Sequence, residues 1–105
     1  MQARKLEMAC PVCASTEVFY TCTPDCCFNH VCNNCGATFE PATTATGRQV
    51  SGITAPHPLP EASDPTVGCA KCYGTAVYMI GESELACAKC GSVLTLEMTE
   101  VARNN

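Results

Sequence analysis

Most of the cysteines in this chain have the spacing of metal ligands. Of the 11 cysteines, eight fall in four C-x-x-C pairs, and two such turns facing each other supply four thiolates in a tetrahedron. The sequence therefore predicts two tetrathiolate sites, each built within one half of the chain, and two Zn²⁺ ions. The expected ligand sets are Cys10, Cys13, Cys32 and Cys35, and Cys69, Cys72, Cys87 and Cys90. A site with four protein ligands has no open position and is structural rather than catalytic.

Three further cysteines lie between the two knuckles of the first half. Cys22, Cys26 and Cys27, with His30 nearby, occupy a finger of 18 residues, against 14 in the second half. Because the second finger contains no cysteine, we expect that the first zinc site does not need these three. Small side chains packed at a hairpin tip, an extra metal site that includes His30, and a disulfide or redox pair are three open interpretations.

Each half resembles a zinc ribbon, the rubredoxin-like zinc-binding β-hairpin module. The resemblance rests on the eight paired cysteines and on the glycine that follows the second pair of each half, Gly36 and Gly91. Glycine suits that position because the chain there often needs positive φ. The resemblance implies a metal-stabilised β fold, and it indicates no particular function because the module is widely reused.

The segments around these knuckles have the composition of short strands. β-branched and aromatic residues over 17–20 and 76–80 predict one strand in each half, and 37–40 and 92–97 predict the strand that follows the second knuckle. The C-terminal stretch 97–105 has a weak helical period and is expected to fray. The predicted fold class is small, metal-stabilised and all-β.

Composition divides the chain into two ribbons and a linker. Five of the seven prolines lie in 41–66, together with Thr, Ala, Ser and Gly, so this segment is predicted to resist helix and sheet. The predicted domains are a first zinc ribbon with a Cys-rich finger (1–40), the linker (41–66), and a second zinc ribbon with a C-terminal tail (67–105). His57, between prolines of the linker, is expected to be solvated.

Charge and cysteine usage narrow the compartment and the partners. The formal net charge is −4, and the six Lys and Arg are scattered, which argues against a phosphate-binding surface. No secretory signal precedes Cys10, and no run has the length of a membrane span. An odd cysteine total in C-x-x-C pairs favours metal over disulfides, so we expect a reduced, cytoplasmic protein.

The residues predict a binding function rather than catalysis. The sequence shows no Ser/His/Asp set, phosphate loop or carboxylate pair in a plausible cleft, so no enzyme activity is expected. We expect a non-catalytic zinc protein that acts as a protein-interaction module or a small accessory subunit of a larger complex. The alternatives are a rubredoxin-like iron electron carrier or thiol-redox protein and, third, a nucleic-acid-binding zinc ribbon.

Overall fold

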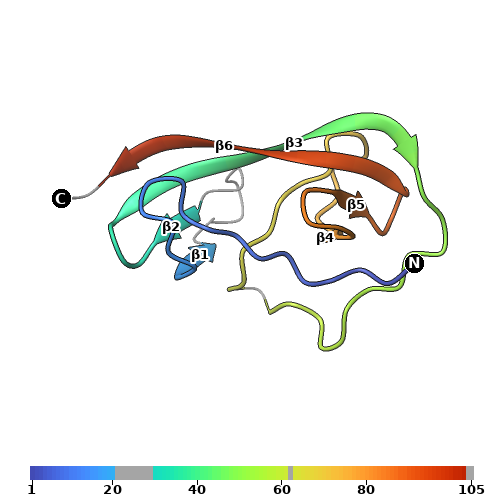
Figure 1. The fold of residues 1–105 in the computed structure, drawn as a ribbon, viewed down its shortest axis with the longest axis horizontal. Coiled ribbons are helices and arrows are strands. Elements are labelled where there is room, and N and C mark those ends of the chain that lie inside the picture. The colour runs from blue at the N-terminus through green and yellow to red at the C-terminus, as the bar shows by residue number, and fades with distance from the viewer. Residues whose placement is uncertain (21–29, 62, 104–105) are drawn as a thin grey trace.

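One antiparallel sheet contains the six strands of the described chain. The computed structural model describes residues 1–20, 30–61 and 63–103. The strand order is β1-β2-β3-β6-β5-β4, with the long central pair lying over two short hairpins (Figure 1). The strands are β1 (Val18–Tyr20), β2 (His30–Cys32), β3 (Ala37–Gln49), β4 (Val77–Met79), β5 (Leu85–Cys87) and β6 (Ser92–Arg103). The small all-β class is confirmed, and these ranges contain no helix that is long and apolar enough to cross a bilayer.

A short hairpin opens each half and brings a knuckle cysteine into the core. Val18 pairs with Cys32 in the first hairpin, and Val77 pairs with Cys87 in the second. Both valines are buried, and both cysteines are at most 1% exposed. The strands predicted at the start of each half are confirmed, and their alternation places a sulfur beside the apolar interior.

Strand β3 continues well past Glu40, where the sequence predicted its end. It runs to Gln49, so the expectation that the following segment resists sheet structure is wrong for this part. Thr43 and its β-branched neighbours favour an extended backbone. Pro41 pairs with Met98 of β6 and is tolerated because, past Phe39, no second named strand flanks β3 on its other side.

Strand β6 contains most of the C-terminal stretch that was expected to fray. It extends to Arg103, which pairs with Ala37 at the start of β3. The expectation of a frayed tail is therefore wrong up to this residue. The sequence did not predict this end of β6 as a strand because its hydrogen-bonding partner, the start of β3, lies far away along the chain.

The two halves are related by an approximate twofold axis through the central pair. Gly91 follows Gly36 by 55 residues, and Glu97 follows Ala42 by the same distance. Ala42 and Glu97 pair with each other across β3 and β6, so the axis passes through this pair. The predicted domain boundaries stay a prediction about independently folding units, but the sheet itself is shared by both halves.

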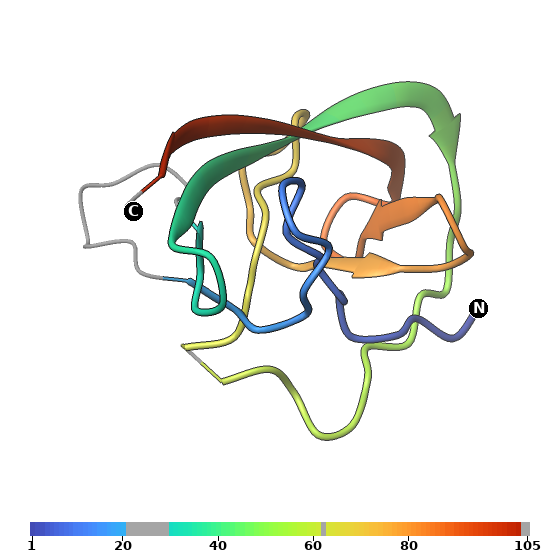
Figure 2. The ribbon, with the colours of Figure 1, turned by 60° about the vertical axis from the view of Figure 1, so that its left-hand side comes forward.

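The N-terminal segment before Cys10 is extended and runs under the sheet, opposite the central pair (Figures 1 and 2). Arg4 and Met79 exchange two backbone hydrogen bonds of 2.7 and 3.0 Å, and Thr54 forms a second bridge nearer the N-terminus. Leu6 is 4% exposed. Burial of a leucine side chain contributes roughly 1.5–3 kcal/mol, so this segment is part of the core rather than a loose arm.

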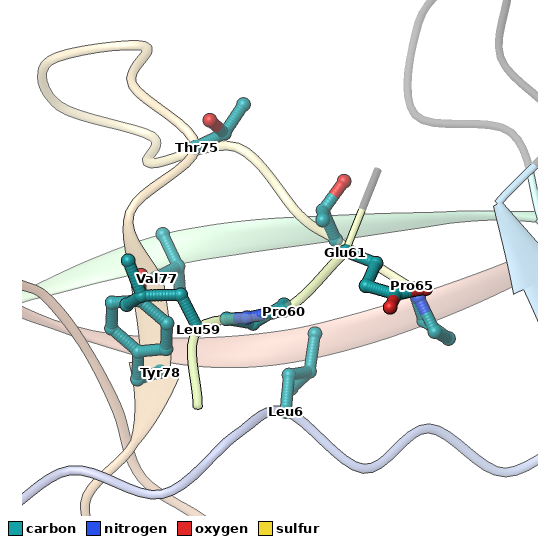
Figure 3. A pocket seen from close by; sticks show the side chains of 9 residues that line it. Leu6, Leu59, Pro60, Glu61, Pro65, Thr75, Val77 and Tyr78 are labelled. Atoms are coloured by element: carbon teal, nitrogen blue, oxygen red, sulfur yellow. The ribbon is translucent and has the colours of Figure 1, made fainter. Parts of the chain in front are cut away.

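The connecting segment is described over residues 50–61 and 63–66, and these parts return along the same side of the molecule (Figure 1). Figure 3 shows Leu59 and Pro60 facing Val77, with Leu6 beside them. These residues line a cavity of about 270 Å³. The proline-rich connection therefore packs against both the N-terminal segment and the second half.

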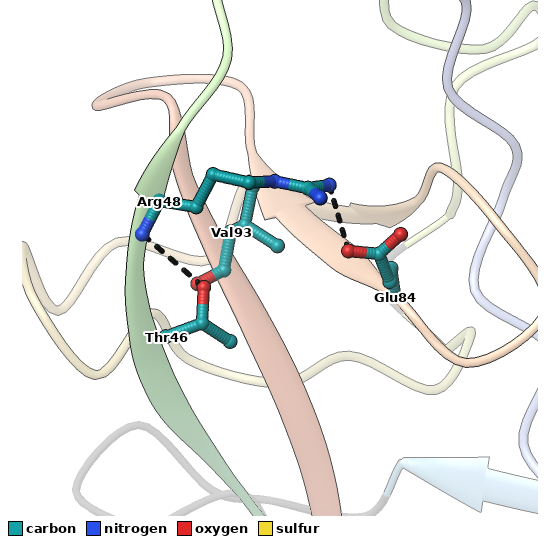
Figure 4. Close-up of polar contacts among 4 residues, drawn as sticks. All are labelled: Thr46, Arg48, Glu84 and Val93. Carbon is teal, nitrogen blue, oxygen red and sulfur yellow. Dashed lines mark hydrogen bonds and ion pairs between the residues drawn. The ribbon is translucent and has the colours of Figure 1, made fainter.

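Polar contacts fix the far end of β3 to the second half (Figure 4). The hydroxyl of Thr46 donates to the carbonyl of Val93 at 3.1 Å and accepts the N–H of Arg48 at 3.3 Å. The Arg48 guanidinium forms a 2.7 Å ion pair with Glu84, next to β5. The strand that begins in the first half thus ends against the hairpin of the second.

Candidate metal centres

The first cysteine group is built from two turns at the ends of the first hairpin. One turn precedes β1, and the other connects β2 to β3. Cys10 Sγ lies 3.6 Å from Cys35 Sγ, and Cys13 Sγ lies 3.5 Å from Cys32 Sγ. All four sulfurs lie within 4.8 Å of one another. The structure therefore brings together the four ligands expected in this half.

The second group repeats this arrangement beside β5. Cys69 Sγ lies 3.6 Å from Cys90 Sγ, and Cys72 Sγ lies 3.5 Å from Cys87 Sγ, again with all four within 4.8 Å. Among the described residues, each group forms within one half, as expected, and neither includes a cysteine of the other half.

The sulfur spacing fits a tetrathiolate metal ion. Zn–S bonds of about 2.3 Å in a tetrahedron place the sulfurs about 3.8 Å apart. The paired sulfurs at 3.5 and 3.6 Å are close to that edge length, and all eight cysteines are free thiols. Each group could hold one metal ion, and four soft thiolate donors suit both zinc and iron.

Local backbone geometry explains why the turns point their sulfurs together. The N–H of Gly36 donates to the carbonyl of Cys32 at 2.9 Å, and the same bond closes the matching turn of the second half at Gly91. Both glycines have the positive φ that the sequence predicted, 77° and 78°. The first knuckle of each half instead carries a side chain at positive φ, at Ala14 (63°) and Tyr73 (61°), which is uncommon for such residues.

The thiols of the first group differ in acidity. The side-chain amide of Asn34 donates to Cys13 Sγ at 3.5 Å and, with the backbone of Ser15, lowers the pKa of Cys13 to about 6. The backbone of Ala37 acts to lower the pKa of Cys35, but burial and hydrogen bonds from the neighbouring thiols raise it to about 12. Without a cation, the four thiols do not ionise together.

The second group has the same contrast with different neighbours. Ser92 lies 3.4 Å from Cys90 Sγ, and its hydroxyl and backbone lower the pKa of Cys90 to about 6. Burial raises the pKa of Cys87 to about 12. Metal binding would therefore displace protons in both groups, so metal affinity rises with pH.

Sequence reasoning did not single out Asn34 and Ser92, although each contacts a sulfur. Asn34 lies within the second knuckle of the first half, and Ser92 lies two residues after the second knuckle of the second half. Neither residue type at those positions distinguishes a sulfur contact from an ordinary turn residue, so geometry was needed to find them.

The structure shows His30 in the core beside the first group. It is fully buried, stacks on Phe39, packs edge-on against Tyr20, and accepts the backbone N–H of Thr66 at its Nε2. The proposed companions of this histidine, Cys22, Cys26 and Cys27, lie outside the described residues, so the extra site stays a prediction. His57 is exposed.

No protein-family model, curated protein or solved structure matches the chain. Its described residues define a small all-β protein with two four-cysteine groups placed for metal binding, consistent with zinc-ribbon-like modules.

Proposed function

We propose that this chain is a non-catalytic zinc-binding protein that acts as a protein-interaction module or a small accessory subunit of a larger complex. The observation that carries the proposal is the pair of closed four-cysteine groups, one in each half of the chain. The short hairpins next to them, β1-β2 and β4-β5, lie under opposite ends of the long central pair (Figure 1). Four protein ligands at each site leave no position for water or substrate, which supports a structural role. Free thiols throughout both groups fit a reducing compartment such as the cytoplasm.

The surroundings of the groups support zinc over a rubredoxin-like iron. Among the hydrophobic residues of the described core cluster, Phe39 is the single aromatic one, with the ring of His30 stacked on it, and the others are Ala, Val, Leu, Met and Cys. Rubredoxin-like iron sites are instead expected in aromatic-rich cores. Zinc also needs no redox partner to do its work, which is to hold the knuckles together.

The exposed position of Tyr73 supports the proposal that the chain binds a protein partner. Its side chain is 83% exposed, and its backbone is held at φ 61° by the knuckle of the second group. It borders a cavity of about 220 Å³ lined by Pro41, Ala42 and Gly68 among others. Aromatic side chains beside an apolar depression are the residues that anchor protein interfaces.

The long strands supply a second kind of contact. Past Phe39, β3 has β6 on one side and no other named strand on the other, and β6 has the same arrangement past Leu94. An extended segment of a partner can add to such an edge through backbone hydrogen bonds. A strand edge without a named strand beside it and a protruding aromatic together suit a surface that docks on a larger protein.

The experiment is metal analysis combined with affinity isolation from the source cells. We expect about two zinc ions per chain, no visible sulfur-to-iron absorption band, and one partner recovered in stoichiometric amount. Tyr73→Ser should reduce partner recovery about tenfold or more at unchanged zinc content, because loss of an anchor residue removes at least about 1.4 kcal/mol. The matched control is Thr75→Ala, at an exposed position of the same turn.

Other outcomes would decide against the proposal. A visible band bleached by dithionite would support the iron carrier. Binding to nucleic acid that weakens steeply with salt would support the nucleic-acid-binding alternative. Equal partner recovery with Tyr73→Ser would remove Tyr73 from the interface.

A further inference from the structure

The two four-cysteine groups carry different charges in their knuckles. Lys71 and Lys89 lie within the two C-x-x-C turns of the second group, and the equivalent positions of the first are Val12 and Asn34. A divalent ion held by four thiolates has a net charge of −2. Positive charge on two residues of the turns favours such a negative centre electrostatically, whereas the first group has no cation in its turns.

Backbone donors to sulfur are also unequal. Cys69 Sγ accepts two backbone N–H groups, from Lys71 and Cys72, each at 3.4 Å. The equivalent Cys10 accepts the N–H of Val12 at 3.4 Å. Hydrogen bonds to a thiolate disperse its charge and hold its orientation, so they strengthen its attachment to a metal.

A buried hydroxyl adds to this difference. Ser92 is 2% exposed and lies 3.4 Å from Cys90 Sγ. The equivalent residue of the first half, Ala37, has no hydroxyl. The side-chain donor of the first group is the exposed Asn34, whose bond to Cys13 competes with water.

The first group is also more accessible to solvent than the second. Cys13 is exposed, whereas the equivalent Cys72 is half-buried. A Cβ added at Gly74 would meet Cys72 Sγ at 3.4 Å and the Lys89 Cδ at 3.5 Å, so the lysine stem lies close over this side of the second group. As a whole residue, Cys13 is therefore more open to an incoming ligand than Cys72.

We propose that the first four-cysteine group is an exchangeable metal site, which gives up its ion to small chelating or thiol ligands, and that the second group keeps its ion permanently. This inference rests on the proposed function, because it requires metal in both groups. Cys13 leaves the metal first, since it is the most exposed of the eight paired cysteines. The incoming ligand forms a bond to the metal in its place, and the released thiolate takes a proton from solvent.

The test follows metal loss from the full chain loaded with two zinc ions. An excess of EDTA is added, zinc release is followed with a colorimetric indicator, and the amide signals of Gly36 and Gly91 report each group by NMR. We expect two phases of one zinc each, with the first faster by about tenfold or more, the lower end of the effect of outer hydrogen bonds on metal affinity. The Gly36 signal should change with the fast phase.

Two reciprocal variants separate this cause from general instability. Val12→Lys places a cation in the first group and should slow the fast phase, while Lys71→Val removes a cation from the second group and should speed the slow one. None of these changes touches a ligand. Equal release rates in the wild type, a fast phase assigned to Gly91, or variants without effect would overturn the inference. Initial binding of fewer than two metal ions would instead overturn the proposed function.

Discussion

Thr66 donates its backbone N–H to Nε2 of His30 at 3.1 Å and so joins the connecting segment to the first hairpin. His30 is fully buried and stacked on Phe39, with ring centroids 5.9 Å apart. The connecting segment is therefore fixed at this end by a side chain that sequence reasoning assigned to a possible metal site. In the structure this imidazole packs in the core and accepts a hydrogen bond.

His30→Ala should lower the free energy of unfolding by about 2–4 kcal/mol, because it leaves a cavity and an unpaired backbone N–H. His30→Phe keeps the ring but removes the acceptor, and should lower it by about 1–3 kcal/mol. Urea unfolding at fixed free zinc measures both. Zinc content should stay at about two per chain, and His57→Ala is the exposed control. Loss of metal from His30→Phe would show that the histidine is a ligand.

Replacement of Cys22, Cys26 and Cys27 by serine together should leave about two zinc ions per chain, because the first group already has four sulfurs within 4.8 Å. Cys32→Ser should reduce the content to about one, since it removes a ligand of the first group. Elemental analysis after gel filtration gives both values. A triple variant with about one zinc would mean that the first site had been assigned to the wrong cysteines.

Gly91→Ala should destabilise the chain by roughly 2–4 kcal/mol, because a Cβ there would lie 2.5 Å from the Val50 carbonyl oxygen at a φ of 78°. Gly47→Ala is the matched control. It has a φ of 87° but no atom within 4 Å of the added Cβ, so it should cost only about 1 kcal/mol. Thermal and urea unfolding of both variants make the comparison. Equal losses would mean that backbone strain, and not the close approach to Val50, decides the effect.

The ion pair between Lys5 and Asp64, 2.9 Å long, gives a pH-dependent prediction. The hydrogen bond from Lys5, with that from the N–H of Glu61, lowers the pKa of Asp64 below its usual 3.8. A lowered folded-state pKa contributes stability that is present above 3.8 and is lost as the pH falls through the folded value.

Asp64→Asn should therefore reduce the free energy of unfolding by up to about 1 kcal/mol. The reduction should be equal at about pH 5 and pH 8. Below about pH 4 the unfolding free energies of the variant and the wild type should converge. Urea titrations of both proteins at each pH measure it. In a Lys5→Met background the effect of Asp64→Asn should shrink. A difference that grows as the pH falls would reverse the assigned sign.

The hairpins and the four-cysteine groups were predictable because their determinants are local. A C-x-x-C turn followed by Gly36 or Gly91 contains its own geometry, and β-branched runs mark the short strands. The starts of the long strands, 37–40 and 92–97, were predicted, but their continuations were not, because these depend on a distant partner. Pro41 and the Thr/Ala-rich run after it read as linker, and they form a strand because β6 pairs with them.

The C-terminal part of β6 was also not predictable from local sequence. Its weak helical period carried no information about the start of β3, to which Arg103 is paired. Tertiary pairing decided both segments. Likewise, the different charges in the turns of the two groups follow directly from the sequence. The contacts of Asn34 and Ser92 with sulfur depend on the folded structure.

Ala42 pairs with Glu97 across the approximate twofold axis. The molecule therefore resembles a symmetric dimer whose two subunits are joined in one polypeptide. In a true homodimer, every substitution appears twice, so both metal sites would change together. Covalent linkage removes that constraint, because each copy of the ribbon occupies a fixed place and changes alone. It also keeps the two copies at high effective concentration, so neither half depends on finding a second chain. One group therefore has Lys71 and Lys89 in its turns, while the equivalent positions of the other group are Val12 and Asn34, within a single shared sheet.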